Sequence, residues 1–260
     1  MNNLILSAAC GLKPEQIEFF LKSLREYYHE DVFFLVGKKD FLTKDFLKTY
    51  NCNFLEVSIH KYDIQLKRYS FFLDIIKKKK YKNILFCDSR DIYFQSNPFS
   101  YDYKGSINFF LEDKKIGDCP FNSTWVIKTY GHKTYLSLSD KIISCGGTIL
   151  GDHNSMEMFL SLMIKELSEH RYKKRLKYIL TFRRDKGGRG SDQAHGNYIA
   201  HNNLIPGSFF HANESGPIAT AYHLKKIKFN SEFKLINKLN EPYAVVHQYD
   251  KRWDKFKDSV

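Results

Sequence analysis

Two carboxylates at the end of an apolar run are the residues best placed to do chemistry in this chain. Residues 83–87, Asn-Ile-Leu-Phe-Cys, predict a buried strand, and Asp88 and Asp91 follow it. Ligands bind at the carboxyl ends of strands in open α/β sheets, and paired carboxylates there suit Mg²⁺ or Mn²⁺ carrying the phosphates of a substrate. A plain turn, with Asp91 paired to Arg90 or Arg68 at the surface, fits the spacing equally well. Spacing alone leaves both interpretations open.

Arg68 is a second candidate because it lies on an apolar stripe of a helix predicted over residues 64–78, which Asp63 can cap. A guanidinium among apolar side chains is expected to be half buried and to need an anionic partner. In this order of strands and helices, the nearest anionic partners are Asp88 and Asp91. The sequence therefore predicts an ion pair between the helix and the acidic turn.

Two short segments further along the chain offer polar groups at the edges of predicted elements. Cys145 and Gly146 precede a short predicted strand, which begins at Gly147. Paired glycines let backbone amides approach a ligand that a Cβ would exclude, although a tight turn into a strand gives the same pattern. Asp192 and Gln193 begin a predicted helix, where an acid is also an ordinary cap. For both segments, a purely structural interpretation and a functional one stay open.

His247 and Glu112 are isolated candidates at the ends of predicted strands. A lone histidine beside Tyr249 is more often a structural residue than a ligand when it is taken by itself. Glu112 follows the strand predicted up to Leu111 and is a candidate second acid or acceptor contact.

Strand and helix patterns alternate three times between residues 3 and 86, which favours an α/β fold with a mostly parallel sheet and helices on both faces. The elements predicted there are strands at 3–9, 32–36, 54–57 and 83–87, and helices opened by Pro14 and covering 40–49 and 64–78. Beyond residue 99 we predict strands at 106–111, 147–150, 218–221 and 243–247, and helices at 122–130 and 191–201. A further helix is predicted to begin at Asn154, which resembles the first residue of a capping box. No repeat or linker divides the chain, so a single Rossmann-like domain is expected over residues 1–260.

The composition fits an ordered globular protein of a reducing compartment. The chain has 260 residues, of which 43% are hydrophobic and 16% aromatic. Its five cysteines are widely spaced without a C-x-x-C pattern, and we expect them to be reduced. The first ten residues predict a strand rather than a secretion signal, and no apolar stretch reaches the roughly 18 residues of a membrane span. The expected location is the cytoplasm, including the inner face of the membrane.

The formal net charge of +12 indicates attraction to polyanions, anionic membrane surfaces or phosphorylated substrates, without choosing among them. Basic residues gather at 77–80, where a solvated helix end is expected, and at 171–189. The second run mixes charge with aromatic residues and glycines, which is typical of a mobile insertion. We expect residues 173–190 to close over a ligand; a static helical insertion is the rival interpretation.

Six short motifs follow one another between residues 3 and 253. They are Ala8-x-x-Gly11, Lys67-Arg68-Tyr69, Cys87-Asp-Ser-Arg-Asp-Ile-Tyr-Phe-Gln95, Cys145-Gly-Gly-Thr148 with Gly151, Ser191-Asp-Gln-Ala-His-Gly-Asn197 and Val245-Val-His-Gln-Tyr249. In this order the chain resembles nucleotide-sugar glycosyltransferases of the A-type fold, particularly the bacterial and algal group whose metal motif reads Asp-x-Arg-Asp-Val-x-Phe-Gln.

The resemblance implies that Asp88, Asp91 and His247 hold Mn²⁺ or Mg²⁺ against the two phosphates of the donor. It implies that Asp192 faces the sugar or the acceptor, as a base or as a positioning group. The donor contacts that it implies are Ala8, Arg68, Asp88, Cys145, Gly146, Gly147 and Gln193. Because the spacing is Asp-x-x-Asp rather than Asp-x-Asp, the acid that binds metal directly stays open. The implied organisation is a nucleotide-binding half at 3–99, a sugar and acceptor half at 100–250 and a basic tail at 251–260.

The function that the resemblance implies is metal-dependent transfer of a sugar from a nucleoside diphosphate sugar, with UDP-sugars favoured, to a hydroxyl of a surface glycan or glycolipid. The basic segments allow peripheral contact with a membrane, and no nucleic acid is expected as a partner. Patterns of P-loop, dinucleotide-binding, serine-hydrolase and zinc-peptidase enzymes do not occur in the sequence. The alternative is a non-catalytic basic protein that binds nucleic acid or an anionic membrane surface.

Overall fold

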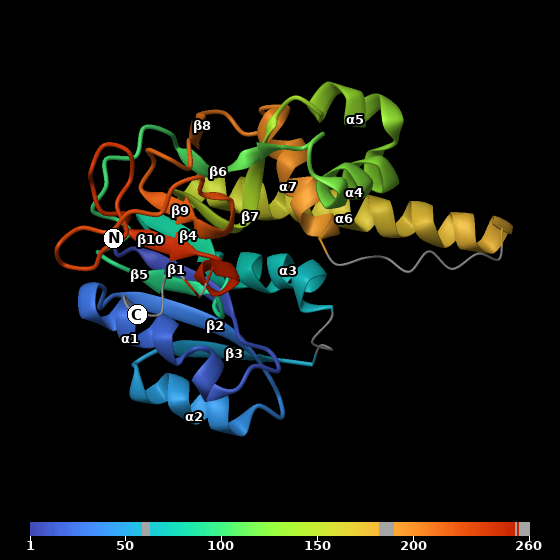
Figure 1. Ribbon diagram of the computed structural model, residues 1–260. Helices are drawn as coiled ribbons and strands as arrows, with labels where there is room; N and C mark the ends of the chain where they lie inside the picture. Colours follow the sequence, from blue (N-terminus) through green and yellow to red (C-terminus); the bar gives the residue numbers. More distant parts are fainter. Residues whose placement is uncertain (59–62, 182–189, 253, 255–260) are drawn as a thin grey trace.

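The computed structural model describes residues 1–58, 63–181, 190–252 and 254, and it describes residues 171–181 through their backbone alone. Its centre is a seven-stranded sheet (Figure 1). In spatial order the strands are β3 (Asn53–Val57), β2 (Asp31–Gly37), β1 (Leu4–Ala8), β4 (Asn83–Cys87), β7 (Ile142–Asp152), β6 (Ile107–Lys115) and β8 (Ser208–His211). The first four run parallel, β7 is antiparallel to both of its neighbours, and β8 is parallel to β6. The predicted α/β fold with a mostly parallel sheet is confirmed.

Helices cover both faces of this sheet, because its central strands are apolar on both sides. On β1, Leu4 and Leu6 pack into one hydrophobic cluster and Ile5 packs into another. The helices are α1 (Glu18–Tyr27), α2 (Phe41–Thr49), α3 (Ile64–Ile76), α4 (Pro120–Tyr130), α5 (His132–Leu138), α6 (His153–Thr181) and α7 (Ser191–His201), with short 3₁₀ turns η1 (Pro14–Gln16), η2 (Ala221–His223) and η3 (Tyr249–Arg252). Residues of α3, α6 and α7 fill the first cluster, and residues of α1 and α2 fill the second.

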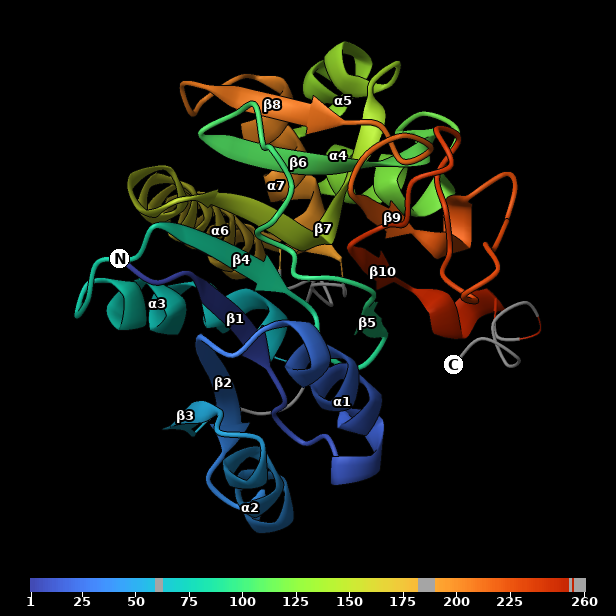
Figure 2. The same cartoon turned by 90° about the vertical axis from the view of Figure 1, so that its left-hand side faces the viewer.

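A second sheet of three short strands lies beside the carboxyl end of β4 (Figure 2). It consists of β5 (Ile92–Phe94), β10 (Val245–His247) and β9 (Ile218–Thr220), with β10 in the middle. β10 pairs antiparallel with β5, so that His247 lies opposite Ile92, and it pairs parallel with β9. This pairing brings the end of the chain next to the acidic turn after β4.

Several predicted bounds were wrong. β6 and β7 are longer than predicted, and β5, β8 and α5 were not predicted. α6 begins at His153 rather than after an Asn154 cap, because the side chain of Asp152 accepts the backbone N–H of Ser155 at 2.7 Å.

The basic segment after Glu169 is also different from the prediction. α6 continues as a helix to Thr181, so the first part of the supposed mobile insertion is regular structure. Residues 182–189, on which the rest of the predicted closing segment falls, lie outside the described residues.

Candidate functional site

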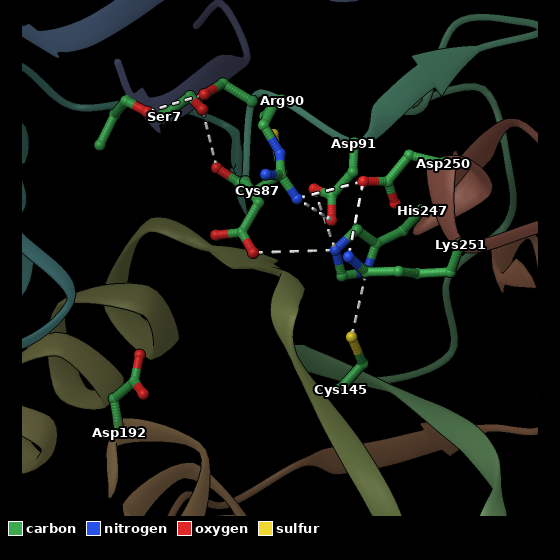
Figure 3. Close-up of polar contacts among 12 residues, drawn as sticks. Ser7, Cys87, Arg90, Asp91, Cys145, Asp192, His247, Asp250 and Lys251 are labelled. Carbon is green, nitrogen blue, oxygen red and sulfur yellow. Dashed lines mark hydrogen bonds and ion pairs between the residues drawn. The ribbon is translucent and has the colours of Figure 1, made fainter. Parts of the chain in front are cut away.

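The structure brings three predicted metal ligands together at the carboxyl end of β4. One ligand atom each from Asp88, Asp91 and His247 lies within 4.8 Å of the others. The Nε2 atom of His247 is 3.7 Å from Oδ2 of Asp88 and 3.6 Å from Oδ1 of Asp91. Figure 3 shows Asp91 and His247 turned toward one another. Side chains that are far apart in the sequence, those of Asp88 and Asp91 and that of His247, thus converge on one point.

Backbone hydrogen bonds fix the position of each ligand. The N–H of Asp88 donates to the carbonyl of Gly147 at 2.9 Å, which holds the end of β4 against β7. The N–H of Gln248 donates to the carbonyl of Asp91 at 2.7 Å, which extends the pairing of β10 with β5. Because four strands (β4, β5, β7 and β10) meet here, both carboxylates and the imidazole are held by regular structure rather than by loops alone.

The pairing of β7 with β6 is irregular where the adjacent glycines Gly146 and Gly147 lie. Phe109 of β6 pairs with Ile149, and Leu111 pairs with Ser144, so a step of two residues on β6 faces a step of five on β7. Such a bulge redirects the chain and is common beside functional sites. A Cβ built on Gly147 would lie 2.5 Å from Cε1 of His247 and 2.7 Å from Oδ2 of Asp88. Only a glycine fits at this place, so the space beside the three ligands depends on it.

Cys145, also on the bulge, contacts His247 from the opposite side of the ring. Its sulfur lies 3.1 Å from Nδ1 of His247 (Figure 3). This contact occupies one ring nitrogen and leaves Nε2 directed at the carboxylates. Nε2 is buried and makes no hydrogen bond with the described part of the chain. Burial alone would lower the pKa of His247, but Cys145, Asp91 and Asp88 outweigh it and raise that pKa well above its ordinary value.

Arg68 is buried and forms the ion pair that its place in an apolar stripe predicts. It donates to Oδ1 of Asp88 at 2.7 Å and to Oδ2 of Asp192 at 3.1 Å. The hydroxyl of Tyr69 also donates to Oδ2 of Asp192, at 3.3 Å. Burial would raise the pKa of Asp88, but Arg68 and His247 lower it well below its usual range. The α3 helix therefore ties two acids that are far apart in the sequence into one network.

Asp91 has a second basic neighbour. Arg90 lies 4.0 Å from its Oδ2 and 3.1 Å from Oδ2 of Asp250 in η3. Burial raises the pKa of Asp91, with His247 opposing and the charge of Asp88 adding to the rise. Asp88 and Asp91 are thus arranged alike: one oxygen faces an arginine, and the other faces Nε2 of His247.

These features fit a divalent cation. The converging atoms are two carboxylate oxygens and one imidazole nitrogen, which Mn²⁺ and Mg²⁺ sites accept. The buried Nε2 of His247 has no hydrogen-bond partner among the described residues, and Gly147 keeps the adjoining space clear of a Cβ. Asp88, Asp91 and His247 are the residues that would hold the ion.

Gln193 and Asp192 start α7 on the other side of the bulge. A Cβ on Gly146 would lie 3.4 Å from Cβ of Gln193, whose amide donates to Oδ1 of Asn122 in α4 at 3.1 Å. Asn197 anchors the helix by bonding the backbone N–H and carbonyl of Ser144 at 2.8 and 2.9 Å. The contacts of Asn122, Asn197 and Asp250 with the site were not predicted, because no local pattern of the sequence indicates contacts between residues so far apart.

The remaining predicted residues lie around this centre in different ways. Ala8 ends β1, and its carbonyl accepts the hydroxyl of Ser89 at 2.7 Å, which places it beside the acidic turn. Glu112 is buried on β6, where its carboxylate lies 3.0 Å from Nε2 of His223. None of its described contacts joins Glu112 to the three metal-ligand candidates. All five cysteines are free and buried, as expected.

Comparison with known proteins leaves the family undecided: no protein-family model matches the chain, and no curated protein is significantly similar to it. Within the described residues, no helix has both the length and the apolar character needed to cross a bilayer.

Proposed function

We propose that this protein is a metal-dependent glycosyltransferase of the A-type fold, which transfers a sugar from a nucleoside diphosphate donor to a hydroxyl of a glycan or glycolipid. The observation that carries the proposal is the convergence of Asp88, Asp91 and His247 at the carboxyl end of a strand in an α/β sheet. That edge is where such sheets bind nucleotides. The resemblance of the six motifs supports the same class, with UDP-sugars as the favoured donors.

Each residue of the centre has a task in this reaction. Asp88, Asp91 and His247 would hold Mn²⁺ or Mg²⁺, which when bound neutralises charge on the leaving diphosphate. Arg68 keeps Asp88 ionised and holds its carboxylate in one orientation through a 2.7 Å contact. Gly147 leaves room for the phosphates against the backbone of the bulge.

Asp192 is the proposed residue nearest the reacting sugar. Burial raises the pKa of its carboxyl, although Arg68 opposes the rise. Such a carboxylate suits either of two roles: accepting a proton from the acceptor hydroxyl, or accepting hydrogen bonds from the donor sugar. Tyr69 and Arg68 hold the same oxygen, Oδ2, which orients the side chain for both roles.

Thermal denaturation with Mn²⁺ and UDP tests the metal site. We expect the two together to raise the Tm of the wild-type protein more than either does alone, because a ligand that binds only the folded state stabilises it. Asp91→Ala should fold but lose this response. Asp45→Ala, which removes an exposed aspartate of α2 paired with Lys48, is the control and should respond like the wild type. An undiminished response of Asp91→Ala would refute the assignment.

A further inference from the structure

His247 is the most deeply buried of the three metal-ligand candidates. Its side chain is 2% exposed, against 14% for Asp91 and 38% for Asp88. At this depth the orientation of the ring depends on contacts with the protein. In the described part of the chain, Nδ1 of His247 has one hydrogen-bonding neighbour, the sulfur of Cys145 at 3.1 Å. Which ring nitrogen faces the carboxylates therefore depends on this contact.

β7 presents two residues of one face to the ring of His247. Side chains alternate between the two faces of a strand, so that residues 145 and 147 point the same way. The contacts follow this alternation: a Cβ built on Gly147 would lie 2.5 Å from Cε1 of His247, the ring carbon between the two nitrogens. A Cβ on Gly146 would instead have Gln193 as its nearest neighbour. Cys145 and Gly147 thus act on the same ring, one by contact and the other by leaving space.

Two other roles for Cys145 fit the structure less well. The sulfur contacts Nδ1, whereas the carboxylates face Nε2, and Figure 3 shows Cys145 and Asp91 on different sides of the His247 ring. Among the described residues, the group that could hold an ion consists of Asp88, Asp91 and His247 and does not include Cys145. Cys145 is also 1% exposed, which leaves its side chain no surface for direct contact with a donor. Its sulfur therefore acts on a ligand through His247.

We propose that Cys145 is a positioning residue of the metal centre, whose sulfur accepts the Nδ1 proton of His247 and so directs the lone pair of Nε2 at the ion. The inference rests on the metal centre of the proposed function. A histidine that binds a metal donates its other N–H to a neighbour, which fixes the tautomer and the orientation of the ring. Sulfur is a weaker acceptor than the usual carboxylate. A thiol need not carry a charge, however, whereas a third carboxylate would be buried beside Asp88 and Asp91.

Calorimetric titration of the metal-free protein with Mn²⁺ tests this role. Cys145→Ala removes the acceptor and should weaken Mn²⁺ binding about tenfold or more, the usual cost of losing such a partner. Cys145→Ser restores an acceptor and should recover most of the lost affinity, which a purely structural role of the sulfur would not predict. Cys52→Ala is the matched control, because Cys52 is also buried and its sulfur lies 3.6 Å from a guanidinium nitrogen of Arg25. It should bind Mn²⁺ like the wild type.

Cobalt substitution separates positioning from ligation in the unaltered protein, so the test does not depend on how the variants fold. Co²⁺ bound by a thiolate has an intense charge-transfer band, and the wild type loaded with Co²⁺ should lack it. A thiolate band in the wild type that disappears in Cys145→Ser would make Cys145 a ligand and overturn the inference.

The titrations can overturn the inference separately from the proposed function. Wild type that binds Mn²⁺, with Cys145→Ala binding it equally well, would refute the role of Cys145 and leave the metal centre standing. Cys145→Ser that binds as weakly as Cys145→Ala would likewise refute it, because the acceptor would not be what matters. Wild type that does not bind Mn²⁺ would refute the metal centre, and the role of Cys145 would fall with it.

Discussion

At the scale of single residues, two neighbouring glycines have different tasks. Both lie on the β7 bulge, yet a Cβ on Gly147 would meet His247 and Asp88 at less than 3 Å, the nearest contacts being 2.5 and 2.7 Å. The atoms nearest to a Cβ on Gly146 would belong to Gln193, at 3.4 Å or more. The space beside the three ligand atoms therefore depends on one of the two positions.

Replacing each glycine by alanine measures this difference. Gly147→Ala should weaken Mn²⁺ binding at least about tenfold, because His247 or Asp88 must move to admit the methyl group. Gly146→Ala should bind Mn²⁺ nearly as well as the wild type, since Gln193 can shift slightly. Calorimetric titration of each protein with Mn²⁺ gives both affinities. Equal losses in the two variants would mean that the methyl group at 147 does not act through the ligands.

At the scale of elements, α6 shows which residue begins a helix. The sequence offers Asn154 with Glu157 as a capping box, but the helix starts one residue earlier than Asn154. Asp152 is the last residue of β7, and its carboxylate accepts the N–H of Ser155 at 2.7 Å. Asn154 is exposed and instead accepts a hydrogen bond from Lys80. The preceding strand places Asp152 where a cap is needed.

Removing the two side chains separately should reveal the true cap. We expect Asp152→Ala to lower the free energy of unfolding by about 1 kcal/mol, because one backbone donor of the first turn loses its acceptor. Asn154→Ala should change it by less than about 0.5 kcal/mol, as usual for an exposed position. Urea denaturation followed by circular dichroism measures both values. A larger loss of unfolding free energy in Asn154→Ala than in Asp152→Ala would mean that Asn154 is the cap after all.

At the scale of the whole molecule, buried histidines link stability to pH. Burial lowers the pKa of His211 to about 4, with the charge of Lys104 adding to the effect. Its Nε2 lies 2.9 Å from Oδ1 of Asn108, which suits a neutral imidazole that donates a hydrogen bond. Burial also lowers the pKa of His201. Both histidines therefore resist protonation in the folded state.

The consequence is a loss of stability in mild acid. Because the pKa of His211 is lower in the folded protein than the ordinary 6.5, the unfolded chain binds the proton first as pH falls. The penalty is absent well above pH 6.5 and grows by up to about 1.4 kcal/mol per pH unit until pH approaches 4. His211→Gln keeps a side-chain N–H donor but cannot be protonated, so it should weaken the dependence of stability on pH. Urea denaturation of the wild type and of His211→Gln at pH 7 and pH 5 measures this dependence. An equal change in the free energy of unfolding for both proteins would contradict the assignment, since the contributions of all other titrating groups cancel in the comparison.

The sequence by itself determined the local parts of this protein. Apolar runs and helical stripes predicted β1 to β4, α2 and α3 closely, because a strand or a helix that buries one side repeats its apolar residues at a short, fixed interval. The helix expected to open at Pro14 begins instead at Glu18, after a 3₁₀ turn. The same reasoning placed Asp88 and Asp91 at the end of a strand and predicted that Arg68 would need an acid. Each of these conclusions depends on residues close together in the chain.

Only the tertiary structure decided which distant residues meet. Arg68 and Asp192 are separated by 124 residues, and Cys145 and His247 by 102. The first contact joins two helices, α3 and α7, that pack into the same hydrophobic cluster, and the second joins strands β7 and β10 of the two sheets. The antiparallel direction of β7, its bulge at Gly147 and the place of β10 beside β5 follow from packing and pairing energies summed over many residues. The periodicity of the sequence does not indicate these summed energies, and for that reason the arrangement of Asp88, Asp91 and His247 in space is seen only in the folded chain.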